Sequence, residues 1–336
     1  MNLLLTVVIP TFGRPEYLER AINSALLSSI DNSVEVIVVP NGPDQSWKKI
    51  EAKYNNNPKV KFQYCAIAHG NAARNVGLSL AKGTFIRFLD DDDYLYPENA
   101  RQQLVLMRAT GGDVCSGKID IVDENGNNYG LCSFPESNDF VEANLRISGI
   151  TLPCSNVYLR KKLKVDWDEN ISRAQDHIFI IDLISNTELV WVKCNSIVGC
   201  WFQHSKDRVS LNKSALKKNQ IIPRWCFDRL IKLHSILRES NRLTDARSKE
   251  ISAALWQFID LNYEKNPSEC NYLIDEIKSL GIGNYNYLGE RFLNHKMILY
   301  FVRSHPELFI RVKKIVKSVC SLFFQKYDNN DYIRKI

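Results

Sequence analysis

The sequence predicts an α/β protein: a mostly parallel sheet flanked by helices, followed by an all-α C-terminal extension. In the first hundred residues, runs that are apolar on both faces alternate with segments whose apolar residues recur at helical spacing. Buried strands that alternate with helices are typical of a parallel sheet covered on both sides. From about residue 214 only the helical period remains. We therefore divide the chain into domains 1–210 and 211–336, on this change of period alone.

The N-terminal elements follow from these patterns in order. Mainly apolar runs predict strands at 3–10, 34–40, 59–67 and 84–89. Helical spacing predicts helices at 15–29 and 70–83. Pro15 suits a first helical turn, and Gly83 is interpreted as the stop of the second helix.

After Pro97 the predicted elements change. Residues 98–110 are expected to form a helix, and 188–202 one or two strands. Asn125-Gly126 lies between two alternating segments, which indicates a hairpin and hence an antiparallel edge on the sheet. The C-terminal helices are predicted at 214–240, 244–265, 268–281 and 306–327.

The composition is that of an ordinary globular protein of 336 residues. No apolar run approaches the roughly 20 residues that a membrane-spanning helix needs, and the N-terminus lacks the basic region of a signal peptide. The nine cysteines are scattered without a C-x-x-C pair, so we expect reduced, mostly buried thiols and a cytoplasmic protein.

Charge is unevenly distributed along the chain. Residues 206–336 hold about 24 Lys and Arg against about 14 Asp and Glu, although the whole chain carries only +6. This asymmetry predicts that the C-terminal part faces an anionic surface, and a nucleic acid or a membrane would both fit.

Four consecutive aspartates, Asp90–Asp93, follow the predicted strand 84–89. They could form a solvated acidic turn, or they could hold a cation that offsets their repulsion. Ligands of open parallel sheets bind beyond the carboxyl ends of the strands. The loops after the first, second and fourth strands are therefore expected to converge, and the aspartates would form an oxygen-ligand site for Mg²⁺ or Mn²⁺. The spacing does not fit a calcium EF-hand.

At this point the residues resemble a known family. The segments "VVIPTFGRPEYLERAINSAL", "VEVIVVPNGPD", "GNAARNVGLSLAKGTFIRFLDDDDYLYPE" and "RAQDHIFI" resemble the inverting glycosyltransferases of family 2, of the bacterial surface-polysaccharide type. The resemblance covers roughly residues 3–210 and is most specific at 70–98. It implies the nucleotide-sugar-binding GT-A fold and makes 1–210 a catalytic domain.

The resemblance also implies roles for individual residues. The nucleotide sugar would be contacted by Pro10, Thr11, Arg14, Asn41, Arg74, Asp90 and Asp91. Asp92 would hold Mn²⁺ or Mg²⁺, with His204 as a second metal or phosphate contact, and Asp176 would be the general base. The residues alone also allow plainer readings: Asp176 as an acid at a helix start, His204 as a strand-end histidine without a ligand, and Arg74 as the ion-pair partner of an aspartate.

The resemblance implies a single displacement that inverts the anomeric centre. The donor would be a nucleotide sugar, most simply a UDP-sugar, and the acceptor a hydroxyl of a glycan or lipid-linked molecule, with no nucleic acid involved. Two residues depart from the family pattern. Asn41 replaces the acid that contacts uracil, which weakens the assignment to uridine, and Gln175 replaces the glutamate before the base.

Two further questions stay open at the level of sequence. The alternative to a glycosyltransferase is a nucleotidyltransferase-like or non-catalytic nucleotide-sugar-binding protein, although the short loop "PTFGRPEY" lacks the Gly-rich pattern of nucleotidyltransferases. The basic, apolar-faced helix 306–327 could place the enzyme on the inner face of a membrane, pack on the catalytic domain or form a homodimer contact.

Overall fold

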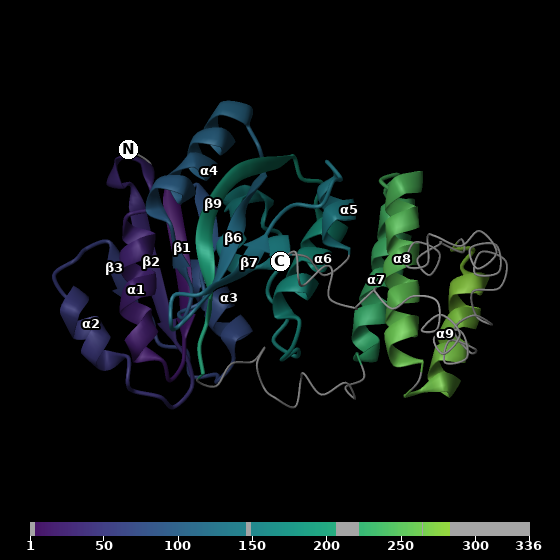
Figure 1. Cartoon of the computed structure of the whole chain (residues 1–336), viewed down its shortest axis with the longest axis horizontal. Helices are drawn as coiled ribbons and strands as arrows, with labels where there is room; N and C mark the ends of the chain where they lie inside the picture. Colours follow the sequence, from purple (N-terminus) through teal and green to yellow (C-terminus); the bar gives the residue numbers. More distant parts are fainter. Residues whose placement is uncertain (1–3, 146–148, 206–221, 264, 283–336) are drawn as a thin grey trace. The chain divides into compact units, whose positions relative to one another are not determined.

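The computed structural model describes residues 4–145, 149–205, 222–263 and 265–282 (Figure 1). Two compact units divide near residue 206. None of the helices in the described ranges is long and apolar enough to cross a membrane. The eight cysteines in these ranges are unpaired, as their spacing predicts, and all but Cys226 are buried.

The first unit is built on a sheet whose described strands run in the order β3-β2-β1-β4-β8-β6-β9-β5, with β7 paired to β6. The strands are β1 (Leu5–Thr11), β2 (Val34–Pro40), β3 (Val60–Phe62), β4 (Phe85–Phe88), β5 (Tyr94–Leu95), β6 (Val114–Asp123), β7 (Asn128–Cys132), β8 (Asn156–Leu159) and β9 (Trp191–Gln203). The helices are α1 (Pro15–Leu26), α2 (Lys48–Tyr54), α3 (Gly70–Leu80), α4 (Pro97–Thr110), α5 (Phe140–Asn144) and α6 (Gln175–Asn186). This is the predicted α/β fold, a mainly parallel sheet flanked by helices.

The apolar runs are buried for the expected reason. Every residue of β1 and β2 is buried, because both strands lie inside the sheet and helices cover its faces. The apolar stripe of α1 lies in the same core, with Leu18, Ala21 and Ile22 all fully buried. The periods read from the sequence therefore identify these elements correctly.

The antiparallel part of the sheet differs from the prediction. β7 does form the predicted hairpin with β6, and Gly126 takes the positive φ of +80° that its turn requires. However, β8 was not predicted, and it lies antiparallel between β4 and β6 in the middle of the sheet. Residues 191–203 form one continuous strand, β9, that pairs in parallel with β6 across a bulge.

The role of Gly83 is corrected by the structure. Helix α3 ends at Leu80, and the residue that stops it is Ala81, which is extended. Gly83 instead lies against β1, where a Cβ atom would come within 2.5 Å of the backbone nitrogen of Thr6. The glycine is needed for this close approach.

The second unit contains the described helices α7 (Arg224–Glu239), α8 (Asp245–Asn262) and α9 (Pro267–Ser279). Each coincides with one of the helices expected after residue 214. In α7 the buried residues Phe227, Leu230, Leu233 and Leu237 recur at helical spacing. The predicted helix 306–327 lies outside the described residues.

Candidate active site

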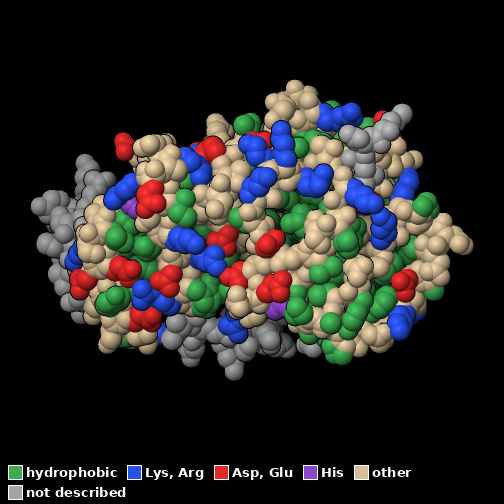
Figure 2. Space-filling model, turned by 180° about the vertical axis from the view of Figure 1, so that it is seen from behind, with side chains coloured by type: hydrophobic (Ala, Val, Ile, Leu, Met, Phe, Trp, Pro, Cys, Tyr) green, Lys and Arg blue, Asp and Glu red, His purple; other side chains and the backbone are tan. Residues whose placement is uncertain are grey.

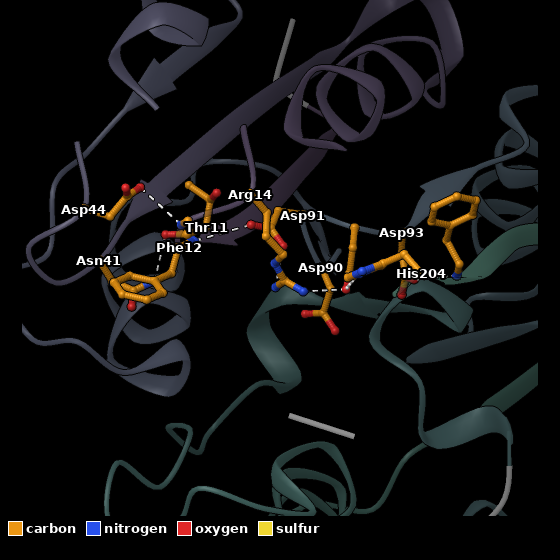
Figure 3. Close-up of polar contacts among 12 residues, drawn as sticks. Thr11, Phe12, Arg14, Asn41, Asp44, Asp90, Asp91, Asp93 and His204 are labelled. Atoms are coloured by element: carbon orange, nitrogen blue, oxygen red, sulfur yellow. Dashed lines mark hydrogen bonds and ion pairs between the residues drawn. The ribbon is translucent and has the colours of Figure 1, made fainter. Parts of the chain in front are cut away.

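The loops that follow β1, β2 and β4 meet at one edge of the sheet, as the parallel strand order predicts (Figure 3). The backbone N–H of Phe12 donates to Asp91 Oδ2 (3.3 Å), which joins the first loop to the third. The N–H of Gly13 donates to Asp44 Oδ2 (3.1 Å), which joins the first loop to the second. These cross-links fix three separate stretches of sequence around one site.

The four aspartates are not a solvated turn. Asp91, Asp92 and Asp93 are at most 4% exposed, and only Asp90 is half-buried. The N–H of Asp93 donates to the carbonyl oxygen of Asp90 (3.1 Å), so the chain turns tightly between them. Burying three carboxylates is costly without counter-charges or a cation.

The turn brings together a set of oxygens that suits a divalent cation. Asp90, Asp92 and Asp93 each offer a carboxylate oxygen, and these atoms lie within 4.8 Å of one another. Carboxylate oxygens are the preferred ligands of Mg²⁺ and Mn²⁺. The residues therefore fit such a cation, and Asp93 is a further candidate ligand. The sequence analysis did not assign it, because a run of four identical acids does not show which of them the turn brings together.

His204 lies beside this group. Its Nε2 atom is 3.0 Å from Asp92 Oδ2, and its side chain is fully buried. The ring of Tyr17 packs against it at 4.6 Å between centroids. His204 and Asp92 are therefore in contact, as expected if both serve one site. The histidine is not an isolated side chain at the end of the strand.

Two arginines balance the acidic turn. The Arg14 guanidinium contacts both Asp91 (2.6 Å) and Asp92, and Arg74 Nη2 contacts Asp90 Oδ1 at 2.7 Å. Burial nevertheless raises the pKa of Asp91 to about 7, with Arg14 opposing the shift and Asp92 adding to it. Arg74 is therefore an ion-pair partner of an aspartate in this structure, as the plainer reading of the sequence had it.

Arg74 is also held by a residue of its own helix and by two residues from a distant part of the chain. Its Nη1 atom donates to Asn71 Oδ1 (3.0 Å) and Gln175 Oε1 (3.1 Å), and its guanidinium carbon lies 4.5 Å from the centre of the Trp167 ring. Gln175 is the first residue of α6, so Arg74 connects the acidic turn with the start of that helix. Sequence alone did not reveal Trp167, because a lone tryptophan in a polar stretch carries no distance information.

Asp176 lies in the first turn of α6 and is half-buried. Burial raises its pKa to about 7, the negative charge of Asp90 adds to the rise, and the Arg74 guanidinium opposes it. Ala174, the residue just before α6, has a φ of +50°, a strained value for a residue with a side chain. A carboxyl group with a pKa near neutrality is suited to accept a proton at physiological pH.

The remaining predicted residues lie around the first two strands. Pro10 and Thr11 are buried at the carboxyl end of β1, and Pro10 is in register with Val39. Asn41 is 6% exposed, and its Nδ2 atom donates to the carbonyl oxygen of Thr11 (3.0 Å). All ten sequence-predicted site residues thus lie on the strand ends, loops and helices at this edge of the sheet, and their roles stay predictions.

The N-terminal part of the chain is similar to known proteins. Residues 6–169, which include all four aspartates, match the sequence family described as Glycosyl transferase family 2. The chain carries a family 2 glycosyltransferase domain. It is 27% identical over 192 residues to an uncharacterized glycosyltransferase of Haemophilus influenzae, covering 56% of this chain and 75% of that one. This glycosyltransferase is also 24% identical over 220 residues to the poly(ribitol-phosphate) beta-N-acetylglucosaminyltransferase TarP of Staphylococcus aureus, covering 62% of this chain and 67% of TarP.

A solved structure shares the fold. The crystal structure of S. aureus TarS residues 1–349 in complex with UDP-GlcNAc superposes with a TM-score of 0.59 and 19% identity, covering 79% of this chain and 74% of that one. At this identity the likeness concerns the fold alone. Neither the family match nor these relatives supports the nucleotidyltransferase alternative.

Proposed function

We propose that this glycosyltransferase is metal-dependent and inverting, and that it moves a sugar from a UDP-sugar to a hydroxyl of a glycan or lipid-linked acceptor in cell-surface polysaccharide synthesis. The observation that carries the proposal is the connection of two acidic sites through Arg74. One is the three-carboxylate group at residues 90–93, where Arg74 contacts Asp90, and the other is the half-buried Asp176, which the charge of Arg74 stabilises as the anion. A transfer from a nucleotide sugar needs both a neutralised diphosphate and a base for the acceptor.

The first site would bind the donor's diphosphate. Asp90, Asp92 and Asp93 would hold Mn²⁺ or Mg²⁺, with His204 adjacent to Asp92. The cation, when bound, supplies Lewis-acid stabilisation of the leaving diphosphate. The buried position of the carboxylates strengthens their electrostatic attraction for a cation, because water screens it less.

The second site would activate the acceptor. Asp176, once ionised, takes the proton of the attacking hydroxyl, and the attack on the opposite face of the sugar inverts the anomeric centre. Arg74 would help to keep Asp176 ionised, since its guanidinium opposes the rise in the pKa of that carboxyl. Gln175, which is neutral, leaves this positive charge available to Asp176 and Asp90.

The orientation of Asn41 supports a uracil base despite the missing acid. A carbonyl oxygen can only accept a hydrogen bond, so the amide nitrogen of Asn41 must face Thr11 O, and its Oδ1 atom is left as an acceptor. Uracil presents an N3–H donor at its edge, whereas the N3 atom of cytosine is itself an acceptor. We therefore propose that Asn41 accepts from uracil in place of a carboxylate.

The relatives indicate which sugars to test first. TarP is named as an N-acetylglucosaminyltransferase, and the TarS structure contains UDP-GlcNAc. Mass spectrometry of the purified protein with UDP-GlcNAc, UDP-GalNAc, UDP-glucose and UDP-galactose, with Mn²⁺ present, should show slow release of UDP from one of them. CDP- and GDP-sugars serve as controls for base selection. UDP release that is unchanged by EDTA would contradict metal dependence, and preference for a CDP-sugar would contradict the role of Asn41.

We also propose that residues 211–336 form a helical domain that places the catalytic domain at an anionic membrane surface. On the face drawn in Figure 2, basic side chains of the described residues are interspersed with acidic and apolar ones, so the proposal rests on the segment 306–327. Its five Lys and Arg residues would each contribute about 1 kcal/mol near an anionic leaflet.

Liposome flotation tests this membrane proposal. Binding should need anionic lipid, weaken at high salt and disappear when residues 306–336 are deleted from a chain that still folds. Binding that is indifferent to lipid charge would contradict it. A deletion that unfolds the protein or converts a dimer to a monomer would instead favour packing within the chain or a homodimer.

A further inference from the structure

The guanidinium of Arg14 lies at the site where a divalent cation is expected to bind. Its two terminal nitrogens contact two different carboxylates, Nη2 with Asp91 Oδ1 (2.6 Å) and Nη1 with Asp92 Oδ2. Burial lowers the pKa of Arg14, but all four aspartates raise it and the net shift is upward, so its charge faces the whole acidic turn. Asp92 also belongs to the group of carboxylates that suits a divalent cation. The guanidinium and the metal would therefore compete for the same carboxylate.

The two arginines of the site differ in how firmly they are held. The Arg74 side chain is 7% exposed, and Asn71, Gln175, Asp90 and the Trp167 ring all contact it. The Arg14 side chain is 24% exposed, and within the described residues its guanidinium contacts only Asp91 and Asp92. Arg14 is the N-cap residue of α1, but its side chain makes no capping hydrogen bond to that helix. It is the arginine that can leave the aspartates without breaking other contacts.

We propose that Arg14 is an internal counter-ion that holds the cation site when no donor is bound, and that it gives up Asp92 to the entering metal and takes the donor's diphosphate as its new partner. The proposal rests on the proposed metal-dependent binding of a nucleotide sugar. Arginine matches phosphate oxygens with two parallel hydrogen bonds, as it matches carboxylates, so the diphosphate can replace the carboxylate that Arg14 loses.

The consequence is that metal and nucleotide strengthen each other's binding. A metal that binds alone must displace Arg14 from Asp92 and gives the guanidinium no partner in return. When the diphosphate is present, the displaced guanidinium gains new partners. Linkage requires that UDP improve the affinity for Mn²⁺ by the same factor by which Mn²⁺ improves the affinity for UDP.

The test is a titration with Mn²⁺, in which electron paramagnetic resonance reports the free ion, with and without UDP. In the wild-type protein UDP should tighten Mn²⁺ binding by about tenfold or more. In Arg14→Gln, Mn²⁺ alone should bind about tenfold more tightly than to the wild type, and the gain from UDP should shrink. Equal or weaker binding of Mn²⁺ alone to Arg14→Gln overturns the proposal.

Arg20→Gln is the matched control for simple loss of charge. Arg20 donates to the backbone carbonyl oxygen of Asp92 (2.8 Å) and stacks on Tyr94 and Phe202, so it lies near the same aspartate and contacts no carboxylate in the part of the chain that the structure describes. Its removal should change the affinity for Mn²⁺ far less than removal of Arg14. Equal gains in the affinity for Mn²⁺ in Arg14→Gln and Arg20→Gln would mean that only the loss of a positive charge matters. That result would overturn the proposal that Arg14 exchanges partners.

A second variant of Arg14 keeps the test valid if Arg14→Gln does not fold, which thermal melting would reveal. Arg14→Lys keeps the charge but cannot form two parallel contacts, so it should bind Mn²⁺ alone more tightly than the wild type and less tightly than Arg14→Gln. Binding equal to the wild type overturns the proposal. If wild-type protein binds no Mn²⁺ even with UDP, the proposed metal-dependent function itself fails, which is a separate result.

Discussion

Two acidic turns of the first unit use the same residue type in opposite ways. The turn at residues 90–93 follows β4, and its Asp91 is fully buried with a pKa raised to about 7 by that burial. The turn that follows β6 begins at Asp123, the last residue of that strand, which is half-buried and accepts hydrogen bonds from Asn127 and Tyr129. These donors hold the pKa of Asp123 well below its ordinary range.

The difference lies in where the partners come from. Asp123 is satisfied by neutral donors within six residues, so its turn is complete as a local structure. The aspartates after β4 depend on Arg14, Arg74 and His204, which are 16 to 112 residues away from them in the chain. A buried charge that needs partners from several elements is costly to maintain, and such groups concentrate at functional sites.

Asp176, like Asp91, is an acid whose pKa burial raises, and the largest expected effect is the loss of turnover when it is replaced. Asp176→Asn should lower turnover by a factor on the order of 10² to 10⁴, because the acceptor proton then has no base, while UDP binding stays nearly unchanged. Steady-state kinetics with calorimetry of UDP binding measure this. Asp168→Asn and Glu169→Gln are the controls, since these acids lie shortly before α6. Near-normal turnover of Asp176→Asn would move the base to one of them.

The next effect tests the acidic turn itself. Asp92→Asn should abolish the gain in UDP affinity that Mn²⁺ provides, a loss of about tenfold or more, because it removes a carboxylate from the cation group. Asp123→Asn removes the same charge from the other turn and should leave that gain intact. Calorimetry of UDP with and without Mn²⁺ compares them. Equal behaviour of the two variants would remove the distinction between the turns.

A smaller effect concerns how the contribution of Asp176 to the stability of the folded protein changes with pH. Its pKa rises from 3.8 to about 7 on folding, so the folded state holds a proton more tightly than the unfolded state. The contribution to stability is present below about pH 4 and is lost as pH rises through 7. Asp176→Asn should therefore gain stability relative to the wild type between pH 5 and 8, on the order of 1 kcal/mol given partial solvent access. Denaturant unfolding measures the difference, and a gap that does not depend on pH would contradict the raised pKa.

The smallest effect is expected at Asp123, and its sign is opposite. The pKa of Asp123 is depressed in the folded protein, so its stabilising effect is present at neutral pH and declines as pH falls below about 4. Asp123→Asn should lower the melting temperature slightly at pH 7 and progressively less in acid, with no change in turnover. A loss of turnover in this variant would show that the hairpin contributes to the site.

Local patterns determined much of this protein. The period of the apolar residues identified the strands β1 and β2 and the helices α1 and α7, because burial of one face or two dictates the spacing. The Asn125-Gly126 dipeptide identified the hairpin, because a turn with positive φ favours these residues. The parallel order of the first strands was enough to predict that their loops meet, and the family resemblance directed attention to the aspartates.

Tertiary structure alone decided the rest, because it depends on contacts between segments far apart in the chain. Sequence could not show that β8 enters the middle of the sheet, since its four residues carry too weak a period. Nor could it show that Asp93 joins the cation group, that Gln175 and Trp167 hold Arg74, or that Arg14 spans two carboxylates. Charges and pKa values follow distance and burial, and neither quantity is fixed until the chain has folded.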